Sequence, residues 1–385
     1  MILHPDREFI LRTLTNLVRI NSINPSIAAD GGGEAQIADY VAHVLRGLGL
    51  DVSTFDSAPG RTTAYGILRG SGGGRSLMLN AHADTVGVEG MVNPFSAEIR
   101  DGRLYGRGAH DMKGSLAAGL GAAKMLVDAG VTLRGNLVVA AVADEEYGSM
   151  GTTDLIPRCR VDAAIVTEPT NLSICLAHKG YVWIDVETSG KAAHGSRFTE
   201  GVDAVMRMGR FLAELERLEV ALRTGPAHPL VGPPSLHAAL INGGTGLSTY
   251  AESCRLQVER RTVPGETVER VGAEVQAIVD RLAAGDPSFR ATVRTFFSRE
   301  PFEVAPDAGI VRVLAAASGA VLDAPPAFVG DTPWMDAALL AAAGVETVVM
   351  GPTGAGEHSA VEWVDVESVV RTAEILARTA ADYCN

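Results

Sequence analysis

Strand-sized apolar runs alternate with amphipathic helical stretches up to about residue 180 of the chain. The predicted helices are Asp6–Ile20, Glu34–Leu48 and Lys113–Ala129, and the predicted strands are Asp51–Phe55, Ala64–Leu68, Ser76–Asn80, Asn136–Ala143 and Ala163–Thr167. Continuous apolar strands separated by helices are typical of a largely parallel sheet that is covered by helices. The glycine run Gly72–Gly74 lies between two of these strands and predicts a hairpin turn.

The order of predicted elements changes after Gly180. Six elements follow as strand, helix, strand, strand, helix and strand: Tyr181–Thr188, Gly201–Leu218, Leu236–Asn242, Cys254–Arg261, Val268–Leu282 and Phe289–Phe297. This order is typical of a ferredoxin-like α+β sandwich. The α/β pattern then resumes, with helices Asp307–Ser318, Met335–Ala343 and Val366–Tyr383 and strand Thr347–Gly351. We therefore predict a discontinuous α/β domain of residues 1–179 and 298–385, which an α+β domain of residues 180–297 interrupts.

Length, charge and cysteine spacing narrow the class of protein. A chain of 385 residues is long for one compact core, which agrees with two domains. Its net charge of −13 argues against a nucleic-acid partner, because binding to phosphates requires a basic surface. The N-terminus lacks the apolar segment of a signal peptide, and no apolar run is long enough to span a membrane. The four cysteines form no ligand-like cluster. We expect a soluble, cytoplasmic enzyme that does not associate with membranes.

Acidic and imidazole side chains follow the predicted strands of the α/β domain. They are His82 and Asp84, Asp144 to Glu146, Glu168, and Glu357 with His358. Asp111 precedes the helix Lys113–Ala129. Ligands of open α/β sheets bind beyond the carboxyl ends of the strands, so we expect these groups to converge on one edge. Without cations their mutual repulsion would raise their pKa values and destabilise the fold. Carboxylates and imidazoles without thiolates indicate a catalytic site for zinc or a similar ion.

Three motifs make this pattern specific. They are His82-Ala83-Asp84-Thr85-Val86, Gly106-Arg107-Gly108-Ala109-His110-Asp111-Met112-Lys113-Gly114 and Asp144-Glu145-Glu146-Tyr147-Gly148-Ser149. Together with Glu168-Pro169, Ala193–Ser196 and His358, they resemble the M20 metallopeptidase family in order and spacing. The resemblance covers essentially the whole chain. It implies a zinc-peptidase-like mixed sheet with helices on both faces, and an inserted ferredoxin-like domain that acts as a lid or dimerisation domain.

The resemblance also implies a set of metal ligands. His82 and Glu168 would bind one zinc ion, Glu146 and His358 would bind the other, and Asp111 would bridge the two. Such an arrangement would hold two metal ions roughly 3.5–4 Å apart, with Co²⁺ able to substitute for Zn²⁺.

Five further residues have expected roles in catalysis or substrate binding. Asp84 would accept the second N–H of the neighbouring imidazole ligand, and Glu145 would act as the general base. His194 would stabilise the oxyanion in the site of the partner subunit. Arg261 would bind a substrate carboxylate. The glycine-rich loop that contains Gly354 would let the backbone approach the substrate.

Structural alternatives remain for several of these residues. Glu145 and Glu146 could form an ordinary acidic helix start, since acidic residues favour the first turn. His194 could be a surface loop histidine, and Arg261 could be a solvated charge at the end of a strand. His110, although next to Asp111, is expected to take part in packing or loop bonding.

The predicted function is hydrolysis of the amide bond of an N-acyl amino acid by a dinuclear-zinc enzyme, with N-acetylornithine deacetylase-like activity as the specific expectation. A succinyl-diaminopimelate desuccinylase, or a dipeptidase or carboxypeptidase of the same family, is the alternative, and the shape of the pocket decides among them. A relative that binds metal or amino acids without turnover is a further alternative, against which the intact Glu145 argues. The expected partners are a small N-acyl amino acid or dipeptide and a second copy of the chain, bound through the inserted domain.

Overall fold

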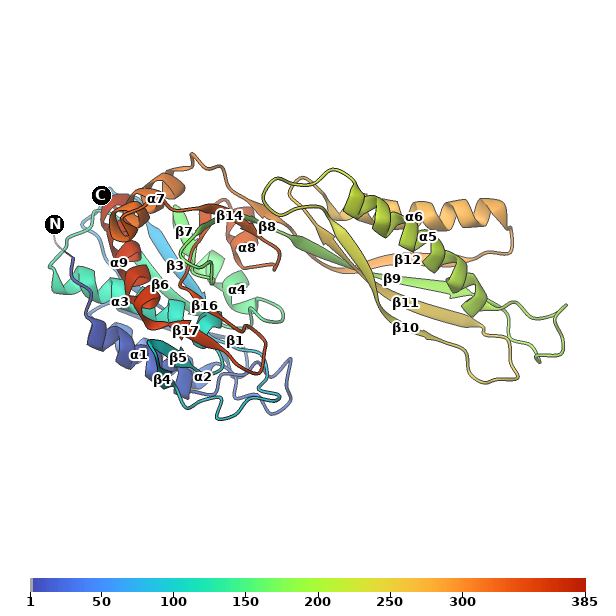
Figure 1. The fold of residues 1–385 in the computed structure, drawn as a ribbon, viewed down its shortest axis with the longest axis horizontal. Coiled ribbons are helices and arrows are strands. Elements are labelled where there is room, and N and C mark those ends of the chain that lie inside the picture. The colour runs from blue at the N-terminus through green and yellow to red at the C-terminus, as the bar shows by residue number, and fades with distance from the viewer. Residues whose placement is uncertain (1–2) are drawn as a thin grey trace. The chain divides into compact units, whose positions relative to one another are not determined.

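The chain forms two compact units in the computed structural model, which describes residues 3–385 (Figure 1). Unit 1 comprises Met1–Leu176, Val304–Val329 and Met335–Asn385, and unit 2 comprises Ala177–Glu303 and Gly330–Trp334. Within residues 3–385, none of the helices has both the length and the apolar character that are needed to cross a bilayer.

The main sheet is mixed, with a parallel centre. Its strands are β1 (Asp51–Ala58), β2 (Arg61–Leu68), β3 (Leu77–His82), β6 (Leu137–Val142), β7 (Ala163–Val166), β8 (Ile174–His178), β13 (Phe302–Glu303), β14 (Phe328–Asp331) and β15 (Glu346–Val349). They lie in the order β1-β2-β6-β3-β7-β15-β8-β13, and β14 pairs with β8. The neighbours β6, β3, β7 and β15 run parallel, whereas β1 and β2 are antiparallel additions. The carboxyl ends of the four central strands therefore meet at one edge.

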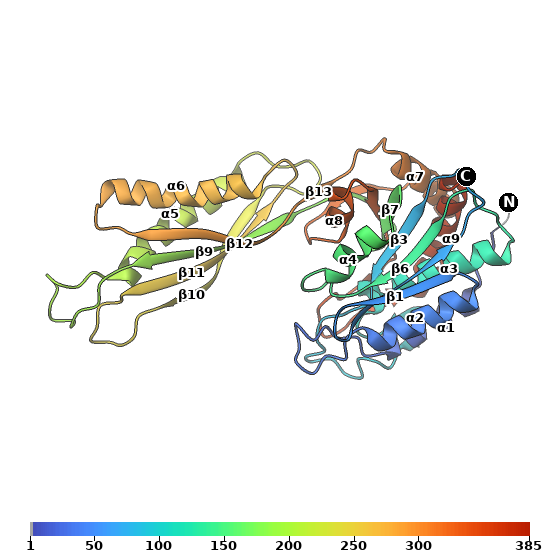
Figure 2. The same cartoon turned by 180° about the vertical axis from the view of Figure 1, so that it is seen from behind.

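The two faces of the sheet are covered by different helices (Figures 1 and 2). One group consists of α1 (Arg7–Arg19), α2 (Ala35–Gly47), α3 (Gly114–Asp128), α7 (Gly309–Leu322) and α9 (Val366–Tyr383), and the other of α4 (Met150–Arg158) and α8 (Ala337–Ala342). Adjacent residues of β3 show the division. The side chain of Leu79 faces α3, because a Cβ placed on Gly119 of that helix would lie within 4.0 Å of it. The side chain of Asn80 faces the other way and donates to Thr152 of α4. Buried on both faces, β3 and β6 are apolar along most of their length, as the sequence pattern predicts.

The prediction of a hairpin at Gly72–Gly74 is wrong. β2 and β3 lie on opposite sides of β6 and both pair with it, so the connection passes the end of that strand. The backbone N–H of Ser71 donates to Leu133 O at 2.8 Å. A Cβ at position 74 would lie 2.3 Å from the carbonyl oxygen of Cys384. The glycine there allows this close passage of the backbone.

A small second sheet joins two distant parts of unit 1. Its strands are β4 (Glu98–Arg100), β5 (Arg103–Tyr105), β16 (Gly354–Ala355) and β17 (Trp363–Asp365), in the order β16-β17-β5-β4. The pairing of β17 with β5 brings the loop after β15 beside the segment that precedes α3. The sequence pattern does not reveal these strands, because two or three residues are too few to show periodicity.

Unit 2 has the predicted ferredoxin-like order. Its elements are β9 (Gly180–Ser189), α5 (Ala204–Thr224), β10 (Ser235–Gly243), β11 (Ser253–Thr262), α6 (Val268–Gly285) and β12 (Ala291–Arg299). The strands form an antiparallel sheet in the order β10-β11-β9-β12. Both helices pack on one face, where Phe211 and Phe289 are fully buried in the core. The predicted fold class is confirmed for both parts of the chain.

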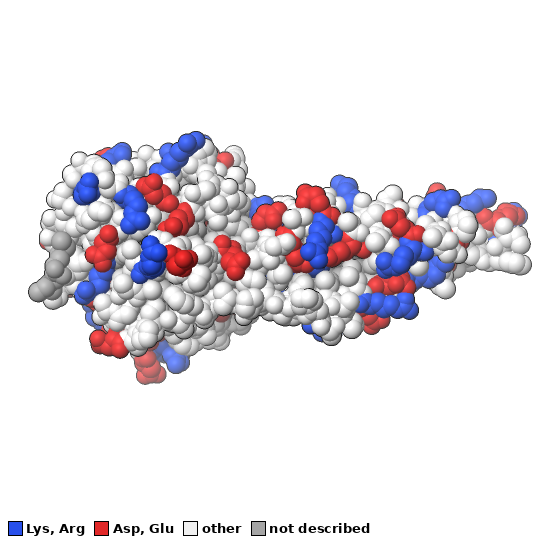
Figure 3. All heavy atoms as spheres, turned by 90° about the horizontal axis from the view of Figure 1, so that it is seen from above, with Lys and Arg blue, Asp and Glu red and all other residues white. Residues whose placement is uncertain are grey.

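Charges on the face that Figure 3 shows are mixed, with lysines and arginines interspersed among acidic residues on both units. The net charge of −13 is thus not gathered there into a single acidic area.

Candidate metal centre

Three of the predicted site segments follow directly from the central strands. β3 ends at His82, β6 leads through Ala143 and Asp144 to Glu145, and β7 leads through Thr167 to Glu168. Because β3 lies between β6 and β7 and runs parallel to both, these side chains meet at one edge of the sheet.

Asp111 and His358 come from segments of irregular backbone. Asp111 has φ −110° and ψ 94°, which is not helical, and the Asp111–Met112 peptide bond is cis. His358 has φ +56°, in the left-handed region. These two residues lie on the segments that the small second sheet joins, so pairing of β5 with β17 brings them together.

Asp111 lies between two imidazoles. Its Oδ1 is 2.9 Å from His82 Nε2, and its Oδ2 is 3.4 Å from His358 Nε2. Each imidazole also has a carboxylate of its own, since His82 Nε2 is 3.7 Å from Glu168 Oε1 and His358 Nε2 is 3.0 Å from Glu146 Oε2. The structure therefore brings all five predicted ligands together, with Asp111 in the geometry of a bridging carboxylate.

The cluster fits a divalent cation by distance and by donor type. Candidate ligand atoms of His82, Glu145 and Glu168 lie within 4.8 Å of one another, and so do those of His82, Asp111 and Glu146. Both sets consist of nitrogen and oxygen donors, which suit Zn²⁺ in a catalytic site. Glu145 lies as close to His82 as the predicted ligands do, so distance alone does not separate a base from a metal ligand.

Electrostatics favour a cation in the same place. Burial raises the pKa of Glu168 well above its usual value, and the opposing charge of His82 offsets this only in part. Burial followed by the charge of Asp111 raises the pKa of Glu146. Hydrogen bonds to Asp111 and Glu146 raise the pKa of His358 to about 10. Protons thus relieve the repulsion among these acids, and a divalent cation can do so in exchange for protons.

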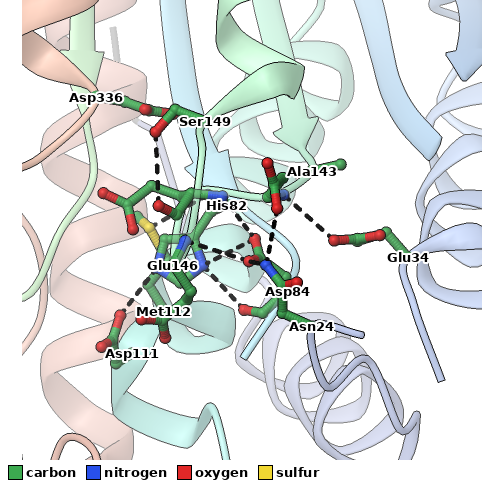
Figure 4. Close-up of polar contacts among 12 residues, drawn as sticks. Asn24, Glu34, His82, Asp84, Asp111, Met112, Ala143, Glu146, Ser149 and Asp336 are labelled. Carbon is green, nitrogen blue, oxygen red and sulfur yellow. Dashed lines mark hydrogen bonds and ion pairs between the residues drawn. The ribbon is translucent and has the colours of Figure 1, made fainter. Parts of the chain in front are cut away.

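Asp84 organises both His82 and the acidic turn after β6 (Figure 4). The acceptor nearest to His82 Nδ1 is the backbone carbonyl oxygen of Asp84 at 2.9 Å, whereas the carboxylate Oδ1 is 3.7 Å away. The Asp84 carboxylate instead accepts the backbone N–H groups of Glu145 at 3.1 Å and of Glu146 at 3.2 Å. Asn24 donates to the same carboxylate at 2.8 Å. Asp84 therefore fixes the turn that presents the two glutamates.

A buried ionic network below this turn was missed by the sequence interpretation. Arg61 donates to both carboxylate oxygens of Glu34 at 2.7 Å and to Asp144 Oδ1 at 2.7 Å. Asn24 donates to the same oxygen of Asp144 at 3.0 Å and links the network to Asp84. Arg61 is 5% exposed and Glu34 is fully buried. A single sequence carries no signal for this network, because its partners lie up to 120 residues apart.

Asp336 is another buried acid that the sequence interpretation did not single out. It is 1% exposed and accepts a short hydrogen bond from Thr152, which in turn accepts one from Asn80 of β3. Burial raises the pKa of Asp336 to about 6, although the bond from Thr152 opposes the shift. Its charge contributes to the raised pKa of Glu145, after burial and Glu168.

Two predicted residues belong to unit 2. His194 is exposed in the loop between β9 and α5, where its Nδ1 accepts the backbone N–H of Ser196 at 3.2 Å. Arg261, in β11, donates through Nε to Glu259 Oε1 at 2.7 Å, and its guanidinium carbon lies 5.1 Å from the centre of the Tyr181 ring.

Gly354 lies in unit 1, in β16, and its lack of a side chain has a local cause. A Cβ there would be 2.5 Å from Nδ1 of the buried His110 and 2.4 Å from the carbonyl oxygen of Trp363. His110 Nε2 lies 2.7 Å from Glu357 Oε1, in agreement with the expected loop bonding.

The mixed sheet, the ferredoxin-like insertion and the cluster of imidazoles and carboxylates at the strand ends define a metal-dependent amidohydrolase. The profile described as Peptidase family M20/M25/M40 matches residues 78–382. The chain belongs to this family, and the resemblance of its motifs is thereby confirmed.

Similarity to individual relatives extends over nearly the whole chain. It is 33% identical over 381 residues to an acetylornithine deacetylase of Myxococcus xanthus, covering 97% of each protein. It is 29% identical over 412 residues to an N-formyl-4-amino-5-aminomethyl-2-methylpyrimidine deformylase of Bacillus subtilis strain 168, covering 98% of this chain and 95% of the relative. The solved structure of a dinuclear metal binding M20 peptidase from Bacillus subtilis has a TM-score of 0.76 at 15% identity, with 98% of both chains covered.

Proposed function

We propose that this chain is a dinuclear-zinc hydrolase that removes the acyl group from an N-acyl amino acid, with N-acetylornithine as the substrate that fits best. The observation that carries the proposal is the position of Asp111, whose two oxygens face two imidazoles that each have a further carboxylate. The similarity to an acetylornithine deacetylase over 97% of both chains supports the choice of substrate.

The metal ligands in this proposal are those predicted from the sequence. His82 and Glu168 would hold one ion, Glu146 and His358 would hold the other, and Asp111 would serve both. When bound, two such ions polarise a carbonyl and lower the pKa of a water molecule between them.

Glu145 carries the proton in the proposed reaction. Its carboxylate takes a proton from the attacking water and passes it to the nitrogen of the leaving amine, so the C–N bond breaks as an N–H bond forms. Burial, followed by the charge of Glu168, raises the pKa of Glu145 well above its usual value.

Two residues of unit 2 have proposed roles, one in stabilising the oxyanion and one in binding the substrate. Since His194 Nδ1 accepts the N–H of Ser196, the neutral ring carries its proton on Nε2 and can donate it to an oxyanion. Arg261 offers a guanidinium for a substrate carboxylate, with Glu259 orienting its Nε.

A homodimer through unit 2 is also part of the proposal. β10 is an edge strand whose residues are mostly exposed, among them Leu240 at 65% and Ile241 at 57%. An exposed apolar edge strand presents unpaired backbone groups and favours pairing with a second strand. In an M20 dimer with this edge buried, each subunit could supply its His194 to the site of the other.

Deformylation is the second candidate, because the chain is 29% identical to a deformylase over 98% of its length. The test is a panel of N-acetylornithine, N-succinyl-diaminopimelate, an N-formylated aminopyrimidine and simple dipeptides, assayed with Zn²⁺ and with Co²⁺. The highest kcat/KM on N-acetylornithine supports the first candidate. A higher value on the formylated substrate or on dipeptides would reassign the substrate, and activity that survives removal of metal would contradict the proposal as a whole.

A further inference from the structure

A buried carboxylate binds the segment that carries Asp111. Oε1 of Glu362 accepts the backbone N–H groups of His110 at 2.9 Å and of Asp111 at 3.0 Å. Its Oε2 accepts the N–H of Gly108 at 2.9 Å and a guanidinium N–H of Arg107 at 2.7 Å. Glu362 is 1% exposed, so the four hydrogen bonds form away from bulk water.

These bonds replace those that a regular helix would supply. The backbone departs from helical geometry at Asp111 and at Met112. Buried N–H groups need acceptors, and Glu362 provides one for each of three such groups near this irregular turn. The carboxylate therefore binds the backbone at Asp111 itself and at two positions just before it.

Arg107 connects the same carboxylate to the other segment. It balances the charge of Glu362 and also donates to the backbone carbonyl oxygens of Gly87 at 2.8 Å and of Ser359 at 3.0 Å. Ser359 directly follows His358 in the chain. The ion pair thus binds both segments that supply site residues with irregular backbone.

A second side-chain contact joins the same two segments. His110 Nε2 lies 2.7 Å from Glu357 Oε1, and these residues are the immediate neighbours of Asp111 and His358 respectively. The ring of His110 is 1% exposed and packs where Gly354 leaves room for it.

We propose that Glu362 and the His110–Glu357 pair are positioning groups that hold Asp111 and His358 as one unit, and thereby set the affinity of the site for its metals. This inference rests on the proposed dinuclear site. Its consequence is that altering these groups weakens metal binding even though none of them is a proposed ligand.

Glu362→Gln tests the first group. Each carboxylate oxygen accepts two donors, so an amide NH₂ at either position would face two N–H groups whichever way the side chain is turned. Loss of a group that orients a ligand typically costs about 10–100-fold in metal affinity. We expect a loss of that size for Co²⁺ and Zn²⁺, measured by competition between the metal-free protein and a chromophoric chelator.

Glu357→Ala and His110→Gln test this side-chain contact, and Glu357 is exposed, so its replacement leaves the core intact. If the pair positions His358, each single variant binds metal more weakly than the unaltered chain. The double variant then binds metal about as tightly as the more impaired single variant, because both changes remove the same contact. A general electrostatic effect of Glu357 would instead persist in the His110→Gln background, and that result would overturn the role of the pair.

Glu367→Gln is the matched control, because it removes the exposed ion pairs with Arg7 and Arg371 at the start of α9. It should leave metal affinity unchanged. Circular dichroism and the melting temperature, both recorded without metal, show whether Glu362→Gln is folded. A folded Glu362→Gln that binds Co²⁺ and Zn²⁺ with unchanged affinity would overturn the inference. If Glu362→Gln does not fold, the result from the His110–Glu357 cycle decides. Failure of the unaltered chain to bind two metals would instead contradict the proposed function, so the two failures are distinguishable.

Discussion

At the scale of single residues, the candidate site contains proposed metal ligands and residues that orient them. Asp111 uses both oxygens toward different imidazoles, while Asp84 has its carboxylate occupied by the N–H groups of Glu145 and Glu146. A carboxylate that already accepts these bonds is suited to orienting its neighbours. Glu145 is close enough to be a ligand, so its proposed role as a base requires a direct test.

Replacing Glu145 by Gln should abolish turnover and preserve metal binding. The amide has the same shape but cannot accept the proton of the attacking water, and loss of a general base typically costs about 10²–10⁴-fold in kcat. Steady-state kinetics and elemental analysis check the two parts of the prediction. Tyr147→Phe, in the same turn and 58% exposed, is the control. Loss of one metal ion in Glu145→Gln would assign this residue as a ligand instead.

Arg61→Met should destabilise the chain strongly. The change leaves Glu34 and Asp144 buried without their cation, and breaking a buried ion pair from one side typically costs about 3–5 kcal/mol. Urea unfolding measures the loss. Arg69→Met removes an exposed pair with Asp51 and should cost about 1 kcal/mol or less. If both variants lose the same amount of unfolding free energy, burial of the Arg61 ion pairs does not explain the effect.

At the scale of elements, the sequence predicted those with enough length to show periodicity. Helix Val366–Tyr383 was predicted with the bounds that the structure shows. The elements of unit 2 were predicted to within three residues, except that α5 ends six residues beyond the predicted end at Leu218. β16 and β17 were missed because they are too short, and α4 was missed although its residues directly follow a recognised motif. The candidate ligands at strand ends were predictable in position because long apolar strands precede them. Glu362 was not, because its partners lie about 250 residues away in sequence.

Cross-strand pairing in unit 2 should make its stability depend on pH. Hydrogen bonds from Arg255 in β11 lower the pKa of Asp185 in β9 from 3.8 to about 2. Burial opposes this shift, and a hydrogen bond from Arg294 in β12 adds to it. The folded state therefore binds this proton less readily than the unfolded state. The stabilisation is complete above about pH 4 and is lost as the pH falls toward 2.

The measurement compares the unfolding free energies of the unaltered chain and Asp185→Asn between pH 3 and pH 6. The difference should be largest at pH 6 and should shrink as the pH falls toward 3, since the unfolded state takes up the proton while the folded state still holds Asp185 ionised. Asp280→Asn, on the exposed side of α6, is the control and should show a small difference that varies little with pH. A difference for Asp185→Asn that is constant across this range would exclude ionisation as its cause.

At the scale of the whole molecule, the proposed dimer gives unit 2 its role. Its six elements form an independent core, and β10 leaves an apolar edge exposed. Leu240→Lys places a charge on this edge, which natural edge strands use to prevent pairing. If β10 forms the proposed dimer interface, the variant should sediment as a monomer and should lose activity, because each site would lack the histidine of a partner subunit.

Mixed dimers distinguish a histidine supplied by the partner from one supplied by the same chain. His194→Ala alone should lower kcat by about 10²–10³-fold, as expected for loss of an oxyanion donor. Glu145→Gln is inactive for a different reason. If His194 acts across the interface, each mixed dimer has one site with both residues intact, so equal mixing and exchange should restore about a quarter of the normal activity. Absence of recovery, with mixed dimers verified by native mass spectrometry, would show that each chain relies on its own histidine.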